Sequence, residues 1–398
     1  MKPLAVRAYS VVTGLGIGQA AHAHALREAR CALAQRRFET AELDTWIGVV
    51  DGLETLAWPR ELADFDCRNN RLALVALQTD DFAAQVAAAA RRHGAARVGV
   101  FLGTSTSGIL HTERAYRERD PATGALPRWL HYAGTHNTYS LAAFVRARLA
   151  LAGPAMVVST ACSSSAKVFA SAARAIALGL IDAAVVGGVD TLCMTTLYGF
   201  RSLELLSSEV CRPWDAERNG LSLGEGAAFA LVERDAAGDR AAPAAWLLGA
   251  GESSDAYHMS SPQPDGEGAA AAMRAALDDA GLAPSDVQYL NLHGTGTPGN
   301  DAAEDKAVIA VFGRALRCSS TKGATGHTLG AAGGVEAALA MLALELGLMP
   351  AGLNRRTPDP QLHAAYVDTP CAAALSVVAS NSFGFGGSNA CLVFGAAR

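Results

Sequence analysis

Short apolar runs alternate with longer Ala-rich segments along most of this chain, and this alternation constrains the fold most strongly. The runs have the length of buried strands, while the Ala-rich segments repeat apolar residues every three or four positions, as helices do. Strands alternating with helices predict an α/β fold, and strands apolar on both faces predict sheets covered on both sides. The predicted strands are Val98–Leu102, Ala155–Ser159, Ala183–Val186, Val287–Leu292, Ala315–Ser319 and Cys391–Phe394, and the predicted helices are Leu72–Arg92, Ser163–Leu178, Ala269–Ala280 and Gly334–Leu346.

A polar stretch near the middle of the chain, Glu233–Pro243, interrupts the alternation. Its Arg, Asp, Gly and Pro content is typical of a connection. A chain of 398 residues is long enough for two domains. We therefore predict an N-terminal half, residues 1–240, and a C-terminal half, residues 241–398, each with strands, a Gly/Ser-rich turn and a long helix.

The overall composition excludes several classes of protein. A net charge of −5 argues against a nucleic-acid-binding surface. The eight cysteines include no Cys-x-x-Cys pair, which argues against a structural zinc site. No basic stretch precedes an apolar run at the N-terminus, and no run reaches roughly 18 apolar residues, so we expect a cytoplasmic protein without a membrane span.

Cys162 lies where a predicted strand ends and a predicted helix begins, in the segment STACSSS at residues 159–165. The first amide groups of a helix lack internal partners and carry partial positive charge. They favour thiolate over thiol, and they can stabilise an oxyanion during acyl transfer. The alternative is a small buried hydrophobe, which suits the other seven cysteines.

Two histidines also leave strand-like runs into Gly-rich turns. His293 opens HGTGTP at residues 293–298, and His327 ends KGATGH at residues 322–327, which begins with one of only four lysines, Lys322. Active sites of α/β proteins gather at such strand ends. A single histidine is more often a core or surface imidazole, but two histidines and a cysteine in three such turns indicate one site. Their spacing resembles no zinc motif, so we expect no catalytic metal.

A fourth Gly-rich turn, NSFGFGGSN at residues 381–389, precedes an apolar strand. A phosphate-binding glycine loop would precede a helix instead. We therefore expect this segment to line a pocket as a mobile aromatic loop.

Together these motifs resemble the elongating β-ketoacyl-[acyl carrier protein] synthases. The resemblance covers about Gly14 to Phe394 and includes RPWD at 212–215, GEG at 224–226 and DAYHM at 255–259. It implies a thiolase-like fold, with two pseudo-symmetric halves in an αβαβα five-layer arrangement, and a dimer. Initiating synthases typically carry Asn in place of the second histidine, so His327 favours the elongating branch. Thiolases use a second cysteine late in the chain, but Cys391 lies in an apolar strand and is discounted.

The resemblance also implies a role for each site residue. Cys162 would take an acyl chain from a carrier protein, and His293 and His327 would stabilise the enolate formed when malonyl-carrier protein loses CO₂. Lys322 would orient and tune the histidines, and the amides of Cys162 and Phe385 would form the oxyanion hole. No cofactor is implied apart from the phosphopantetheine carried by the acyl carrier protein.

Pocket and docking residues are carried over in the same way. Thr295, Thr297, Ser260 and Ser261 would line the phosphopantetheine path, and Phe200, Thr106 and Phe383 the substrate pocket, with Phe385 as its gate. Arg68, Arg71 and Arg201 would dock the acidic carrier, because Glu204 stands where a carrier-contacting arginine is common.

Several alternatives stay open. The enzyme could serve a specialised polyene or polyketide pathway, such as an aryl polyene pathway, paired with a silent homologous chain-length-factor subunit. It could transfer acyl groups without condensation, or be a silent binding partner, although such partners usually replace the nucleophile. Acyl length, the starter and the homo- or heterodimeric state do not follow from the sequence.

Overall fold

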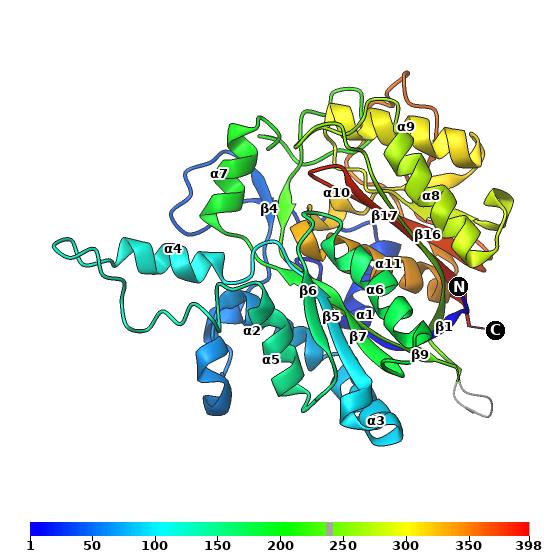
Figure 1. Ribbon diagram of the computed structural model, residues 1–398. Helices are drawn as coiled ribbons and strands as arrows, with labels where there is room; N and C mark the ends of the chain where they lie inside the picture. Colours follow the sequence, from blue (N-terminus) through cyan, green and yellow to red (C-terminus); the bar gives the residue numbers. More distant parts are fainter. Residues whose placement is uncertain (236–241, 398) are drawn as a thin grey trace.

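The computed structural model describes residues 1–235 and 242–397, and its strands form two sets that repeat one topology (Figure 1). The N-terminal strand set runs in the order β6 (Ala155–Val158), β5 (Val98–Gly103), β7 (Ala183–Asp190), β9 (Gly226–Arg234) and β1 (Leu4–Thr13). The C-terminal strand set runs in the order β12 (Arg317–Ser319), β11 (Tyr289–Asn291), β16 (Val377–Gly384), β17 (Ser388–Ala396) and β10 (Ala245–Ser254). In each set the first three strands are parallel and the fourth is antiparallel to the third.

The two strand sets meet along a short ladder between β1 and β10, from Leu4↔Leu247 to Val6↔Ala245. β14 (Ala365–Tyr366) extends the outer edge of the C-terminal set, and β2 (Gly16–Ile17) pairs with β1. The predicted boundary at residues 240 and 241 falls in the segment 236–241, outside the described residues. The remaining short strands are β3 (Ala34–Gln35), β4 (Trp46–Gly48), β8 (Leu223–Gly224), β13 (Leu348–Met349) and β15 (Cys371–Ala372).

Helices complete a five-layer arrangement. α6 (Ser164–Ala177) and α11 (Ala332–Leu346) pack on each other and touch strands of both sets, so they form the middle layer. α2 (Arg68–Leu77), α3 (Phe82–His93) and α5 (Tyr139–Arg148) cover the outer face of the N-terminal set, whereas α8 (Glu267–Ala280), with α9 (Pro298–Phe312) packed on it, covers the C-terminal set. This confirms the predicted thiolase-like αβαβα fold. The other helices are α1 (Gly18–Arg27), α4 (Ile109–Arg117), α7 (Met194–Ser202) and α10 (Lys322–Thr325).

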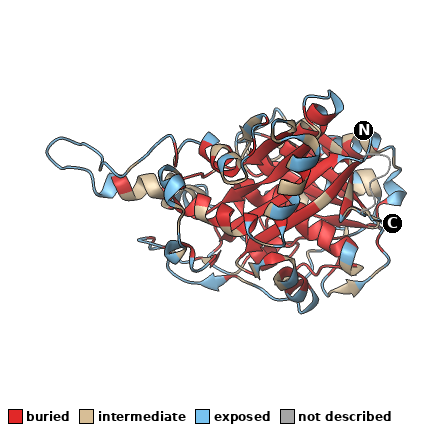
Figure 2. Cartoon of the chain, turned by 90° about the horizontal axis from the view of Figure 1, so that it is seen from below, coloured by how far each residue is buried: buried red, intermediate tan, exposed pale blue. Residues whose placement is uncertain are grey.

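The middle layer explains why α11 is apolar all round. Every residue from Ala332 to Leu344 is buried. Figure 2 shows that buried residues fill the interior of the protein. The window Leu329–Leu346 is long and apolar enough to cross a membrane, with a mean hydropathy of 1.5, but 89% of it is buried inside the protein. A helix packed between two sheets needs apolar side chains on both faces, so we assign this window to the core.

One local expectation changes in the structure. The predicted helix Leu72–Arg92 is two helices, α2 and α3, because Asp80 and Asp81 adopt positive φ angles of 55° and 53° that break the helix.

The segment from α4 to residue 138 extends away from the body as an arm (cyan, Figure 1). Its exposed aromatic side chains are Tyr116, Trp129 and Tyr132.

Candidate active site

The candidate site forms where four strands of the two sets end. Cys162 follows β6, His293 follows β11, Lys322 follows β12 and Phe385 follows β16. The carboxyl ends of neighbouring parallel strands share one edge, and the repeated topology turns the two edges toward each other. Segments more than 200 residues apart therefore contribute to one cavity.

Cys162 sits in a tight turn between β6 and α6. Ala161 adopts a positive φ of 52°, a conformation that is uncommon for a residue with a side chain. The turn is held by the hydroxyl of Ser163, which donates to the Thr160 carbonyl at 2.9 Å, and by that of Ser164, which donates to the Ala161 carbonyl at 2.6 Å. The thiol is therefore held rigidly two residues before the helix begins, in agreement with the predicted strand-to-helix turn.

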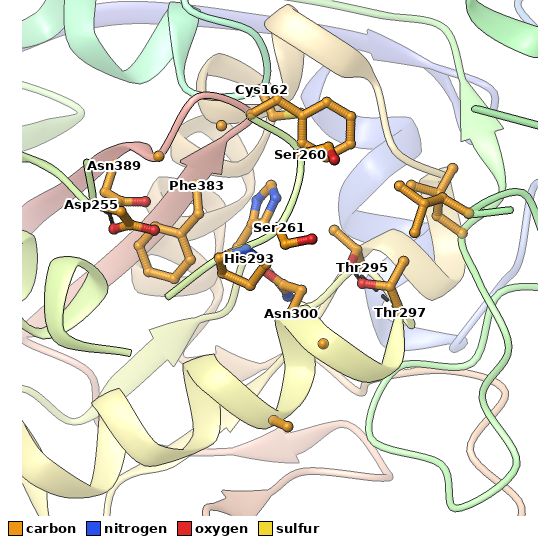
Figure 3. Close-up of a pocket in the computed structure, with 18 of the residues that line it drawn as sticks. Cys162, Asp255, Ser260, Ser261, His293, Thr295, Thr297, Asn300, Phe383 and Asn389 are labelled. Carbon is orange, nitrogen blue, oxygen red and sulfur yellow. Dashed lines mark hydrogen bonds between the residues drawn. The ribbon is translucent and has the colours of Figure 1, made fainter. Parts of the chain in front are cut away.

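The two histidines lie beside this thiol. The sulfur of Cys162 and one ring nitrogen each of His293 and His327 all lie within 4.8 Å of one another, and all three residues are buried. The imidazole rings meet edge to face, with centroids 5.3 Å apart. Figure 3 labels Cys162 and His293 among the residues that line the pocket. A single ligand atom can therefore contact the sulfur and both rings.

Hydrogen bonds at the far side of each ring fix its tautomer. The backbone N–H of Leu329 donates to Nδ1 of His327 at 3.1 Å. Nζ of Lys322 lies 3.3 Å from Nδ1 of His293, and it also donates to the His293 carbonyl at 2.6 Å and to Glu336. Because an ammonium and a backbone N–H can only donate, Nδ1 of each ring is an acceptor and Nε2 carries the proton. The site thus holds two N–H donors on neutral imidazoles.

Burial keeps these imidazoles neutral. It lowers the pKa of His293 and of His327 well below the usual value, and the nearby Lys322 ammonium lowers both further. The folded site therefore stays unprotonated below pH 6.5, where histidines in the unfolded chain take up protons. These two histidines therefore leave the free energy of unfolding unchanged above pH 6.5 and lower it as the pH drops below 6.5.

Burial also controls the nucleophile, and here the structure differs from the sequence-based expectation. Desolvation raises the pKa of the Cys162 thiol to about 12, although Lys322 and a hydrogen bond from the Phe385 backbone lower it. The resting site therefore holds a thiol, whereas the position before α6 predicts a thiolate. The loss of hydration outweighs the positive groups around the sulfur.

We expect the alkylation rate of Cys162 by iodoacetamide to rise about tenfold per pH unit between pH 7 and 9, because only the thiolate reacts. Mass spectrometry of the Cys162 peptide gives the alkylation rate. A small-molecule thiol, with its rate divided by its own thiolate fraction, shows whether the reactivity of iodoacetamide itself changes with pH. A rate that reaches a plateau below pH 8 would show instead that the helix terminus determines the ionisation.

Buried carboxylates that the sequence reasoning missed hold the turns in place. Glu304 on α9 accepts the backbone N–H groups of His293 and Gly294 at 2.8 and 2.7 Å. Asp301 accepts the N–H of Gly296 at 3.2 Å, and Glu336 on α11 pairs with Lys322. For Glu336 the sequence signal that could have found it is an acidic residue inside an apolar helix segment.

The cavity in front of the thiol has a volume of about 500 Å³. Its lining contains most of the predicted substrate residues, together with Asp255, Asn300 and Lys306, which were not predicted. Figure 3 shows Ser260, Ser261, Thr295 and Thr297 around this cavity. The predicted residues in the lining are Cys162, Phe200, Ser260, Ser261, His293, Thr295, Thr297, His327, Phe383 and Phe385.

Two predicted contact residues are corrected. Thr106 is 1% exposed and lies outside the cavity lining, and its hydroxyl donates to Asp190 at 2.7 Å. Arg68 is 7% exposed and binds Glu225 with two guanidinium nitrogens at 2.6 Å, so it cannot reach a docked protein. Arg71 is half-buried and paired with Asp66, whereas Arg201 on α7 is exposed. Only Arg201 of the three offers an open guanidinium.

The Cys–His–His cluster also has the number and kinds of ligand that a zinc ion accepts. Lys322 argues against this use, because its ammonium lies beside His293 and would repel a second cation. That the site acts without a metal stays a prediction.

Comparisons with known proteins agree with one another. Residues 2–237 match the family described as Beta-ketoacyl synthase, N-terminal domain, and residues 244–356 match Beta-ketoacyl synthase, C-terminal domain. The chain is 35% identical over 316 residues to 3-oxoacyl-[acyl-carrier-protein] synthase 2 of Staphylococcus aureus, covering 75% of this chain and 77% of that protein. It is 38% identical over 308 residues to Nodulation protein E of Rhizobium meliloti, covering 75% and 76% of the two chains.

Solved structures show the same likeness over the full length. The ketosynthase ApeO, solved in complex with its chain length factor ApeC from Xenorhabdus doucetiae, is 37% identical, with a TM-score of 0.89 over 99% of this chain and 98% of that one. The ishigamide ketosynthase/chain length factor is 27% identical, with a TM-score of 0.89 over 100% and 99%.

Proposed function

The chain belongs to the β-ketoacyl synthase family, and from this premise we propose that it extends a carrier-bound acyl chain by decarboxylative condensation with malonyl-carrier protein. One observation carries the proposal. A buried thiol faces two neutral imidazoles, each with its N–H free to donate into the same small space. A thiol can hold an acyl group, and two N–H donors suit the oxyanion of an enolate.

In the first half-reaction Cys162 attacks the thioester of the acyl-carrier protein. A new carbon–sulfur bond forms, the bond to the carrier's phosphopantetheine sulfur breaks, and the thiol proton of Cys162 leaves with that sulfur. The backbone N–H groups of Cys162 and Phe385 would hold the oxyanion of the tetrahedral intermediate. The product of this step is a neutral thioester, which is compatible with the buried site.

In the second half-reaction Nε2–H of His293 and of His327 donate to the thioester carbonyl of malonyl-carrier protein. The carbon–carbon bond to the carboxylate breaks and CO₂ leaves. The electron pair of that bond stays on the α-carbon and forms an enolate, which the two donors stabilise. The enolate carbon attacks the acyl group on Cys162, and the carbon–sulfur bond breaks to give β-ketoacyl-carrier protein. The sulfur leaves with the electron pair as a thiolate and takes one proton from solvent, which restores the resting thiol. Neutral rings suit this step, since they donate without protonating the enolate carbon.

The remaining pocket residues fit a phosphopantetheine arm. Thr295 and Thr297 present hydroxyls 2.8 Å apart, and Ser260 and Ser261 line the same cavity. Such groups can bind the amides of the arm. The reaction then needs no cofactor beyond the arm itself, which the carrier protein brings, and the enzyme would act in the cytoplasm.

Acyl carrier proteins are acidic, and we assign Arg201 to their docking, because it is exposed and follows the pocket residue Phe200 on α7. Arg201→Glu should raise KM for acyl-carrier protein about three- to tenfold, with unchanged kcat and melting temperature, because an exposed charge affects association. Arg91→Glu, which changes an exposed arginine on α3, is the matched control. An unchanged KM would remove Arg201 from the docking surface.

We also propose a dimer built on two exposed features. β6 is the outermost strand of the N-terminal set, one of its edges is unpaired among the residues that the structure describes, and Met156 on it is 38% exposed. The aromatic arm after α4 extends beyond the body on its own. Native proteins usually cover apolar strand edges, and a second subunit is one way to do so.

A second function is favoured by one observation, the full-length likeness to the ketosynthase ApeO with its chain length factor. On this alternative the enzyme builds a polyene or polyketide and its partner subunit is a silent homologue. Light scattering, which gives the oligomeric state, and the condensation assay together separate the two roles. A homodimer that condenses by itself supports fatty-acid-type elongation, whereas an inactive monomer supports the need for a second subunit.

The proposed chemistry is tested by incubating the protein with acyl-carrier protein and then with malonyl-carrier protein. We expect an acyl adduct on Cys162 by mass spectrometry, followed by CO₂ release and a β-ketoacyl product. An adduct without a product would support simple acyl transfer, and neither an adduct nor a product would support a binding role. Acyl chains of varied length and unsaturation in the same assay would identify the substrate.

A further inference from the structure

Asp190 is a buried carboxylate at the end of β7 that the proposed mechanism does not use. It is 0% exposed and accepts hydrogen bonds from five donors in two distant segments. Four of them belong to the loop after β5: the hydroxyls of Thr104 and Thr106 at 2.6 and 2.7 Å, and the N–H groups of Ser105 and Thr106, each at 2.9 Å. The fifth is the N–H of Gly330, at 2.5 Å from Oδ2.

The first of these segments leads to the nucleophile. Ser105, whose backbone Asp190 holds, donates its own hydroxyl to the carbonyl of Ala161 at 3.2 Å. Ala161 is the residue before Cys162 and has the positive φ that aims the thiol. Two hydrogen bonds therefore connect the carboxylate to the turn that presents the sulfur.

The second segment leads to the histidine. Gly330 follows Leu329, whose N–H fixes the tautomer of His327, and Leu329 itself has a positive φ of 56°. The approach at Gly330 is so close that a Cβ there would lie 2.7 Å from Oδ2 of Asp190 and 2.7 Å from the N–H nitrogen of Ser105. The glycine is therefore needed for the carboxylate to reach this backbone.

Since the site catalyses the condensation proposed above, we propose that Asp190 is a positioning residue that holds the Cys162 turn and the His327 tautomer in register with each other. It touches neither reacting group, so it acts through Ser105 on one side and through the Leu329–Gly330 backbone on the other. An error in either position would separate the acyl carbon from the enolate that must attack it.

The charge of Asp190 argues for a geometric role. A negative charge near Cys162 opposes formation of the thiolate, so this carboxylate does not activate the nucleophile.

A carboxylate accepts at both oxygens, whereas an amide accepts at only one. An asparagine that kept its oxygen toward the loop after β5 would turn its NH₂ group toward the N–H of Gly330.

Asp190→Asn is therefore the sharpest test. We expect condensation to fall about 100-fold, as for displaced catalytic groups, while KM for malonyl-carrier protein changes less than about threefold and the acyl adduct on Cys162 still forms. In ¹⁵N-histidine spectra, the signals assigned to His327 by comparison with His327→Gln should lose the pure Nε2–H pattern. A purely structural role would leave that tautomer unchanged in the folded variant.

Glu233→Gln provides the matched control. Glu233 is a buried carboxylate on β9, pairs with Arg92, and lies opposite Ala183 at the other end of β7. It should lose stability without a change in condensation or in the His327 signals.

The outcomes are distinguishable. Condensation at the wild-type rate in Asp190→Asn, or a loss with an unchanged His327 tautomer, overturns the positioning role. If the variant does not fold, Gly330→Ala tests the same contact from its other side, with the same expected readouts. A wild-type protein that forms no adduct and no product overturns the proposed condensation itself, and in that case the tautomer measurement still reports on the contact.

Discussion

Cys162→Ala is expected to abolish the acyl adduct and to lower condensation by more than about 10⁴-fold, the scale of losing a covalent nucleophile. Decarboxylation of malonyl-carrier protein should persist within about tenfold, because the two imidazole donors that stabilise the enolate do not depend on the sulfur. Intact-protein mass spectrometry measures the adduct, and CO₂ release with product mass measures the two later steps.

The control for this variant is Cys391→Ala. Cys391 is equally buried, but it lies within β17, away from the cavity lining. It should retain acylation and condensation with only a modest loss of stability. An adduct that survives in Cys162→Ala, or that disappears in Cys391→Ala, would contradict the assignment of the nucleophile.

Lys322→Met is expected to produce the second large effect, on both stability and activity. It leaves the buried carboxylate of Glu336 without its partner, which should lower the free energy of unfolding by about 3–5 kcal/mol. It also removes the donor at Nδ1 of His293, so the proton is no longer fixed on Nε2, and condensation should fall about 100-fold. Urea unfolding and the condensation assay measure the two losses.

The double variant Lys322→Met/Glu336→Leu separates these effects. With both charges replaced by apolar side chains, most of the lost stability should return, since a buried ion pair often contributes little over a packed apolar pair. The activity should not return, because the imidazole still lacks its donor. Recovery of both would mean that Lys322 acts only by preserving the fold.

Much of the fold can be predicted from local sequence. The apolar runs at β5, β7 and β11 and the helices α6, α8 and α11 are visible in the sequence because buried elements leave an apolar pattern. The long strand β1 was not predicted, although it joins the two strand sets. Its role depends on pairing with β9 and β10, more than 200 residues away, and such pairing leaves no local signal.

The residue types and turns of the candidate site also follow from local sequence. A cysteine, two histidines and a lysine in Gly-rich strand exits predict a nucleophile with donors, and all four residues meet in the structure. The carrier-docking prediction shows the limit. Arg68 and Arg201 are equally basic in the sequence, but Arg68 lies buried against Glu225. Exposure depends on what covers a residue, and in this case the partners are Val50, in the segment after β4, and Glu225, directly after β8.

The sequence by itself therefore determined which groups could react and which turns would present them, since turn geometry and apolar periodicity are properties of neighbouring residues. Only the tertiary structure decided that Cys162 rests as a thiol, that Lys322 holds the proton of His293 on Nε2, and that Thr106 turns to Asp190 instead of the pocket. Each of these depends on water exclusion or on a hydrogen-bond partner far away in the chain, and neither is encoded within a motif.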